Sequence, residues 1–149
     1  MRTLGVAVVG TGFIGPVHVE AIRRLGHRVV GILGSTPEKS QTAATLLRIP
    51  HGYLNFDELL ADKSVEVVHL TSPNRQHFSQ CRKVLAAGKH IVCEKPLAVN
   101  SQETGELVRL AALANVVAAV NYNVRYYPLC LEARAKRLAG ALGPIHHVT

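Results

Sequence analysis

Residues 4–15 read LGVAVVGTGFIG, an apolar run of strand length that ends in a glycine-rich turn. The glycines, Gly10, Gly12 and Gly15, follow the spacing G-x-G-x-x-G that is typical of dinucleotide-binding turns. The first glycine lets the chain leave the strand sharply, the second lets the backbone approach a pyrophosphate, and the third lets the next helix pack close to the strand. The first N–H groups of that helix then face the phosphates. We therefore predict a strand, a phosphate-binding turn and a helix.

The composition indicates one globular domain without a membrane span. The chain has 149 residues, of which 48% are hydrophobic, and this is enough to form the core of a single domain. No run of about 18 uncharged apolar residues occurs, and no small-residue cleavage site follows an apolar leader. The cysteines Cys81, Cys93 and Cys130 form no C-x-x-C pair, so they are expected to be reduced thiols. We expect a cytoplasmic protein with no membrane partner, no disulfide framework and no metal site.

The net charge of +7 raises the question of nucleic-acid binding. The basic residues are scattered along the chain, apart from a small cluster at Arg134, Lys136 and Arg137. Aromatic residues are not interleaved with them, as they are in proteins that bind single strands. An anionic cofactor or a partner surface explains the excess of positive charge at least as well, so we expect no nucleic-acid partner.

Apolar segments of strand length alternate with amphipathic segments of helical length along nearly the whole chain. Strands are expected at residues 6–9, 29–33, 52–53, 65–70, 90–93 and 116–120, and helices at residues 13–25, 37–47, 56–61, 76–87, 101–113 and 129–139. Helix caps are expected at Thr36, Asn55 and Asn100. This alternation predicts an α/β fold with a doubly wound, Rossmann-type parallel sheet in a single domain.

The end of the chain has a different pattern. Gly143-Pro144 interrupts the last helix, and residues 145–149 have the character of a strand that is just beginning. We therefore expect an NAD(P)-binding domain over residues 1–143 and the start of a truncated second domain over residues 144–149. An uncovered strand at this end would favour self-association, so a homo-oligomer is expected.

The segment after the second strand bears on the choice between NAD and NADP. NAD sites commonly carry an Asp or Glu there, which accepts hydrogen bonds from the ribose 2′-hydroxyl. Residues 21–37 contain no acidic side chain, and Gly34 stands where the carboxylate is expected. The hydroxyls of Ser35 and Thr36 and the ammonium of Lys39 favour a 2′-phosphate, so NADP is expected over NAD. In the alternative interpretation, these hydroxyls only cap the helix and the lysine points to solvent.

Three further segments carry a family resemblance. They are SPNRQH at residues 72–77, EKPLA at residues 94–98 and NYNVRYYP at residues 121–128. Together with the glycine turn, and in this order, they resemble the Gfo/Idh/MocA family of oxidoreductases (glucose–fructose oxidoreductase and inositol dehydrogenase). Members of that family continue with a second α/β domain that carries the substrate pocket and, commonly, an acid/base histidine.

The resemblance implies Lys95 as a catalytic residue and a set of cofactor-binding positions. That set, combined with the glycine turn and the second strand, is Gly10, Gly12, Phe13, Ile14, Gly15, Ser35, Thr36, Lys39, Thr71, Ser72, Pro73, Asn74, His77, Glu94, Lys95, Asn123 and Arg125. The three segments follow predicted parallel strands, and open α/β sheets bind ligands at the carboxyl ends of such strands.

Other interpretations of single residues stay open at this stage. Glu94 and Lys95 could form an exposed charged turn, and Asn74 could cap the next helix instead of lining the crevice. His18 is expected to be a packing or capping residue rather than a catalytic one. Cys93 is expected to be a buried strand residue, since no base is evident beside it.

The function expected from these features is hydride transfer between a nicotinamide and a sugar, polyol or similar secondary alcohol. A lysine beside the nicotinamide could hydrogen-bond the substrate hydroxyl and assist its oxidation. The chain alone is expected to bind the cofactor without turnover, because the residues of the substrate pocket are absent. The alternative is a dinucleotide-binding module with a structural or regulatory role.

Overall fold

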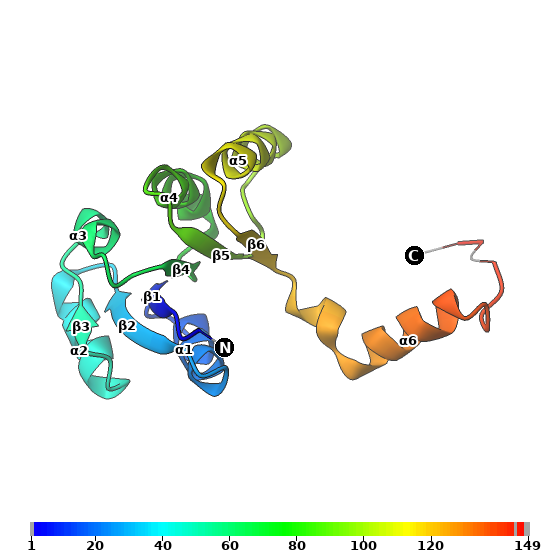
Figure 1. The fold of residues 1–149 in the computed structure, drawn as a ribbon, viewed down its shortest axis with the longest axis horizontal. Helices are drawn as coiled ribbons and strands as arrows, with labels where there is room; N and C mark the ends of the chain where they lie inside the picture. Colours follow the sequence, from blue (N-terminus) through cyan, green and yellow to red (C-terminus); the bar gives the residue numbers. More distant parts are fainter. Residues whose placement is uncertain (1, 145, 148–149) are drawn as a thin grey trace.

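The computed structural model describes residues 2–144, 146 and 147 of the chain. Its centre is a six-stranded parallel sheet with the order β3-β2-β1-β4-β5-β6 (Figure 1). The strands are β1 Gly5–Val9, β2 Arg28–Leu33, β3 His51–Gly52, β4 Val67–Leu70, β5 His90–Glu94 and β6 Ala118–Asn121. The helices are α1 Ile14–Arg24, α2 Pro37–Leu46, α3 Phe56–Ala61, α4 Asn74–Ala86, α5 Ser101–Ala114, η1 Asn123–Tyr126 and α6 Pro128–Leu138. The predicted doubly wound parallel sheet is confirmed.

Helices cover the sheet on both faces because consecutive residues of the central strand point to opposite sides. Val6 and Val8 of β1 pack in one cluster with residues of α1 and α2. Ala7 and Val9 pack in the other cluster with residues of α3, α4 and α5. The apolar run without alternation, which predicted a buried parallel strand, therefore corresponds to a strand with a hydrophobic core on each face.

The three predicted helix caps are present. The side chains of Thr36, Asn55 and Asn100 accept hydrogen bonds from the backbone N–H three residues later, at 3.3, 2.9 and 2.8 Å. In the last two, the carboxylates of Glu58 and Glu103 accept a hydrogen bond from the backbone N–H of the residue before the cap. This is a variant of the predicted capping box, in which the glutamate would reach the N–H of the cap itself.

The structure differs from the predicted elements at two places. Helix α4 begins at Asn74 with Pro73 in the N-cap position, so Asn74 is a helical residue and does not fill the capping position. After β6 the chain forms the short helix η1, which the sequence pattern did not predict. It then continues into α6, whose residues are all exposed and which projects from the body of the domain (Figure 1). Much of the strand start expected at residues 145–149 lies outside the described residues.

The carboxyl ends of the strands place the predicted motifs along one edge of the sheet. Backbone hydrogen bonds join the three central strands at this edge, from Gly10 N–H to Leu33 O at 2.8 Å and from Thr71 N–H to Val9 O at 2.7 Å.

The described part of the chain contains neither a candidate membrane-spanning helix nor a candidate metal-binding cluster. None of its helices has the length and apolar character of a membrane span, and no group of three or more metal-ligating side chains is found.

Candidate dinucleotide-binding site

The glycine turn is built by close backbone approach. Gly10 has φ +116°, and a Cβ on it would lie 2.5 Å from Thr71 Oγ1 and 2.6 Å from Thr71 O. A Cβ on Gly15 would overlap the carbonyl oxygen of Gly10. A Cβ on Gly12, by contrast, would meet no described atom within 4 Å. Gly10 and Gly15 are therefore required by the fold itself, whereas the open space beside Gly12 is available to a ligand.

A cavity of about 1050 Å³ opens beside this turn. Its walls come from the glycine turn, from the end of β2 with α2, and from the loop after β4 with the start of α4. The predicted cofactor residues that line it are Gly10, Gly12, Ser35, Lys39, Thr71, Ser72 and Pro73. No described side chain caps the N-terminus of α1. Gly15 N–H donates to Gly12 O at 3.1 Å and Pro16 has no N–H, so a phosphate would rely on the N–H groups of the glycine turn and of Ile14. The volume and the donors fit the adenosine and pyrophosphate parts of a dinucleotide.

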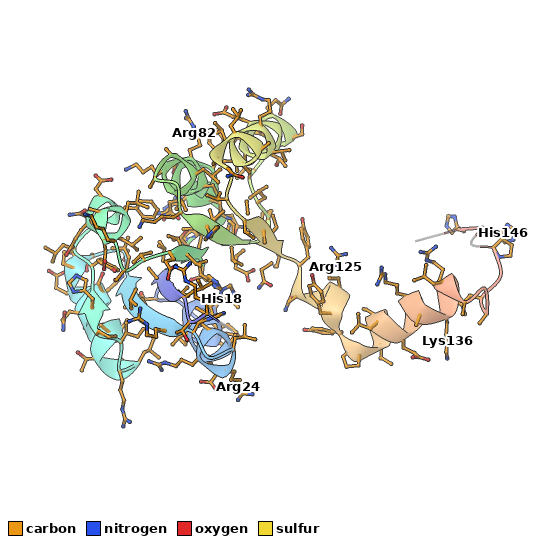
Figure 2. The ribbon with its side chains drawn as sticks, in the orientation of Figure 1. His18, Arg24, Arg82, Arg125, Lys136 and His146 are labelled. Carbon is orange, nitrogen blue, oxygen red and sulfur yellow. The ribbon has the colours of Figure 1, made fainter. Side chains whose placement is uncertain are left out.

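The remaining predicted cofactor residues lie outside this cavity. They are Phe13, Ile14, Gly15, Thr36, Asn74, His77, Glu94, Lys95, Asn123 and Arg125. Asn123 and Arg125 belong to η1, at the base of the projecting arm, and Figure 2 shows Arg125 there, beyond the end of the sheet. The structure thus gathers the turn, the end of β2 and the loop after β4 around one cavity, and leaves the segment after β6 apart from it.

The end of β2 is shaped by its contact with α2. The hydroxyl of Ser40 accepts a hydrogen bond from Gly34 N–H at 2.8 Å, and a Cβ on Gly34 would lie 2.9 Å from the Cβ of Lys39. The close packing of α2 therefore disfavours the carboxylate that NAD sites carry at this position. Lys39 Nζ donates to Ser35 Oγ at 3.1 Å, while the Thr36 side chain caps α2.

Two charged residues of the cavity were not assigned from the sequence. Glu38 lines it from α2, and a hydrogen bond from Thr36 lowers the pKa of this carboxyl group. Arg75 lines it from the first turn of α4. The position of Arg75 within SPNRQH, directly after a strand end, is a signal that could have identified it. Lys39 and Arg75 together outweigh Glu38, so the side chains of the cavity carry a net positive charge.

His77, a predicted residue of the cofactor crevice, does not line this cavity. Its ring is fully buried, with 0% exposure. Nδ1 lies 2.8 Å from Pro96 O and Nε2 lies 2.9 Å from Ser72 O. His77 therefore ties the loop after β4 to the turn after β5 and acts on any ligand only through these loops.

A second polar cluster lies where β4, β5 and β6 end. His18 of α1 is 6% exposed, and its Nε2 lies 3.0 Å from Glu94 Oε1 while its Nδ1 lies 2.9 Å from His69 Nδ1. The amide of Asn121 donates to the same Glu94 oxygen. His18 is thus a packed, hydrogen-bonded residue and no helix cap. Sequence reasoning missed His69 and Asn121, although a polar residue within the apolar strand β4 was a visible signal.

The environment shifts the pKa values of this cluster. Burial, together with the charge of His18, lowers the pKa of His69 to about 4. Burial raises the pKa of Glu94, but hydrogen bonds from Asn121 and His18 outweigh it, so the pKa of this carboxyl group lies below its usual value. A hydrogen bond with Cys81, followed by burial, raises the pKa of the Cys93 thiol. Cys93 is therefore the buried strand residue that was expected.

Lys95 follows this cluster directly in the chain. Its backbone N–H donates to Glu94 Oε2 at 3.3 Å, and its side chain is exposed at the carboxyl edge of the sheet. The edge thus presents an exposed lysine that directly follows in sequence a carboxylate held in place by other side chains. That arrangement can donate a hydrogen bond or a proton to a ligand at this end of the site.

The glycine turn, the edge position of EKPL and the β4 loop agree with the comparison to known families. A model described as an oxidoreductase family with an NAD-binding Rossmann fold matches residues 4–122. The chain belongs to the Gfo/Idh/MocA oxidoreductase family.

Three of the proteins similar to this chain have names that refer to sugars, whereas others are named trans-1,2-dihydrobenzene-1,2-diol dehydrogenase. The 1,5-anhydro-D-fructose reductase of Ensifer adhaerens is 34% identical over 72% of this chain and 32% of its own length. The D-xylose 1-dehydrogenase (NADP(+)) 2 of Haloferax volcanii is 31% identical over 95% of this chain and 44% of its own. A levoglucosan dehydrogenase solved with NADH and levoglucosan matches with a TM-score of 0.92 and 27% identity, over 97% of this chain and 41% of that chain. The chain spans less than half the length of each of these relatives.

The lowered pKa of His69 predicts a pH-dependent stability. A histidine with an ordinary pKa of 6.5 in the unfolded chain and about 4 in the fold binds a proton more readily when unfolded. The free energy of unfolding should therefore fall by about 1–3 kcal/mol between pH 7 and pH 4 through this residue. Urea unfolding of the wild type and of His69→Gln, at intervals across this range, measures the difference. The exposed His147→Gln variant serves as control, and equal pH profiles for all three proteins would contradict the prediction.

Proposed function

We propose that this chain is the dinucleotide-binding part of an NAD(P)-dependent oxidoreductase that acts on a sugar, polyol or similar secondary alcohol. The observation that carries the proposal is the cavity beside Gly12, lined by the glycine turn, the end of β2 and the loop after β4. The sugar names of the 1,5-anhydro-D-fructose reductase and the D-xylose 1-dehydrogenase support the substrate class.

Different residues of the chain would contact the adenosine and pyrophosphate part of such a cofactor and the substrate beside its nicotinamide ring. Gly12 and the N-terminus of α1 would hold the pyrophosphate, and Ser35 and Lys39 would hold the ribose of the adenosine. When bound, the nicotinamide ring accepts or donates the hydride. Lys95, exposed at the carboxyl edge of the sheet, would hydrogen-bond the reacting hydroxyl and stabilise the negative charge that develops on its oxygen.

The contrast between Gly10 and Gly12 tests dinucleotide binding directly. A valine at Gly12 has room in the fold but occupies the ligand space, so it should weaken NADH and NADPH binding at least tenfold with little change in melting temperature. The matched variant Gly10→Ala should lower the free energy of unfolding by about 2–4 kcal/mol, because it adds both strain and a clash with Thr71. Calorimetric titration and thermal unfolding on each variant separate these effects. Undiminished dinucleotide affinity in Gly12→Val would refute the assignment of the cavity.

A second prediction concerns the choice of cofactor. We propose that NADPH binds more tightly than NADH, because Lys39 and Arg75 favour a 2′-phosphate more than Glu38 opposes it. Lys39→Ala should weaken NADPH binding about tenfold and leave NADH nearly unchanged, whereas Glu38→Gln should strengthen NADPH. Ser35→Asp is the variant expected to favour NADH, since a side chain at Gly34 would displace α2. Titration of each variant with both cofactors is the measurement, with the distant, exposed Lys63→Ala as control. Equal or tighter NADH binding by the wild type would mean that Ser35 and Lys39 serve only the helix terminus.

A third prediction concerns Lys95 in a full-length enzyme. In a relative that carries the same lysine, its replacement by methionine should lower kcat about 10²–10⁴-fold, because the proton donor or hydrogen-bond donor at the reacting oxygen is lost. In this chain Lys95→Met should leave cofactor affinity within about twofold, as should the control Lys83→Met. A normal kcat combined with weaker cofactor binding would assign Lys95 to the ribose or the carboxamide instead.

A further inference from the structure

The cavity has two walls that the pyrophosphate and the ribose leave unused. Helix α2 contributes the apolar side chains of Ala43 and Leu46, and the first two turns of α4 contribute the amides of Gln76 and Gln80. In the proposed function the pyrophosphate lies at the glycine turn and the ribose at the end of β2, so the attached base extends to these walls. An apolar wall together with a few polar groups suits a flat heterocycle with polar edges.

Three side chains that line this cavity are joined in one chain of hydrogen bonds. The hydroxyl of Ser72 donates to Gln80 Oε1, and Gln80 Nε2 donates to Gln76 Oε1 at 3.2 Å. Gln76 and Gln80 lie four residues apart on α4, so their side chains share one face of the helix. Ser72 is buried, with 9% exposure, so its hydroxyl needs a partner within the fold. The chain of hydrogen bonds therefore begins at a buried group and ends at the exposed Gln76.

These hydrogen bonds determine which way each amide points. Reversing the Gln76 amide alone would bring its NH₂ group against that of Gln80, and two donors repel each other. Reversing both amides would make Ser72 the acceptor and leave its hydroxyl proton without an acceptor among the described residues. In the observed orientation Gln76 Nε2 donates to none of the described residues. Because a carbonyl oxygen has two lone pairs, Gln76 offers a ligand one donor and one further acceptor.

This donor and acceptor match the polar edge of adenine. Adenine carries an amino donor at position 6 beside a ring nitrogen that accepts, and a glutamine amide binds such an edge through paired hydrogen bonds. Hypoxanthine carries a carbonyl acceptor at position 6 instead, which would face the Gln76 oxygen. Arg75 also lines the cavity, but a guanidinium has donors only and would favour the carbonyl base. Gln76 and Arg75 thus predict opposite preferences between the two bases.

We propose that Gln76 selects a dinucleotide whose base is a 6-aminopurine, and that Ser72 and Gln80 are positioning residues that hold the Gln76 amide in the orientation this requires. The proposal rests on the proposed function and adds to it the recognition of the base. Gln76 Nε2 donates to a ring nitrogen of the base, and Gln76 Oε1 accepts from the 6-amino group as well as from Gln80. This selection is independent of the choice between NAD and NADP, which differ only at the ribose.

The first experiment compares NADH with reduced nicotinamide hypoxanthine dinucleotide in calorimetric titrations of the chain. The wild type should bind NADH about ten- to hundredfold more tightly than the hypoxanthine analogue. Gln76→Met preserves the length of the side chain and removes both polar atoms, so it should weaken NADH binding and bring the two affinities within about twofold of each other. The matched control is Gln102→Met, at an exposed glutamine of α5 outside the cavity, which should keep the wild-type ratio.

The second experiment tests the positioning role of Gln80 with the same two dinucleotides. Gln80→Met removes the donor that holds the Gln76 oxygen, so the Gln76 amide can reverse and pair with hypoxanthine. The ratio of the two affinities should fall by about threefold or more, chiefly because the hypoxanthine analogue binds more tightly. A residue that only supported the fold of α4 would affect both dinucleotides alike and leave the ratio unchanged, so an unchanged ratio overturns the positioning role.

The wild-type ratio distinguishes failure of this proposal from failure of the proposed function. Equal affinities for the two dinucleotides, both weakened by Gly12→Val, overturn the recognition of the base and leave the proposed function standing. Tighter binding of the hypoxanthine analogue also overturns it and assigns the base to Arg75. A ratio that persists in Gln76→Met overturns the role of Gln76, and if this variant does not fold, Gln80→Met carries the test. Failure of the wild type to bind either dinucleotide refutes the proposed function and this proposal together.

Discussion

The site depends on the contact between the glycine turn and the end of β4. Gly10 lies against Thr71 so closely that a Cβ would not fit, and the Thr71 hydroxyl donates to Val9 O at 3.0 Å. Gly15 brings the start of α1 against the Gly10 carbonyl in the same way. Strand β1, helix α1 and the loop after β4 are thereby fixed relative to one another. Gly12 lies between these two closely packed glycines, and the space beside it is open.

A buried histidine extends this rigid unit to the other end of the sheet edge. His77 contacts the carbonyl oxygens of Ser72 and Pro96, one in the wall of the cavity and one in the turn that follows Lys95. Because its ring is fully buried, it reaches a bound ligand only by holding these two loops. One buried side chain therefore holds in place both the cavity wall at Ser72 and the turn that follows Lys95.

Local sequence patterns predicted the parts of the structure that depend on neighbours in the chain. The apolar strands, the caps at Thr36, Asn55 and Asn100, and the glycine turn are features of a few consecutive residues, and all were placed correctly. The cluster around His18 could not be predicted in this way, because its members are 51 to 103 residues from His18 and meet only through the register of β4, β5 and β6. The burial of His77 and the contact of α2 with Gly34 likewise arise from packing between elements.

The contact at Gly34 has a consequence for how cofactor preference could change during evolution. An acidic residue at this position is reachable by one substitution, but its Cβ would meet Lys39 and the backbone of Ser40. Such a substitution would be penalised unless α2 had first moved outward through changes at other positions. The order of substitutions therefore matters, and a lineage with this packing would reach an acidic site more readily through Ser35. The close packing of the end of β2 against α2 thus limits which substitutions can change the preference between NAD and NADP, independently of their contacts with the cofactor.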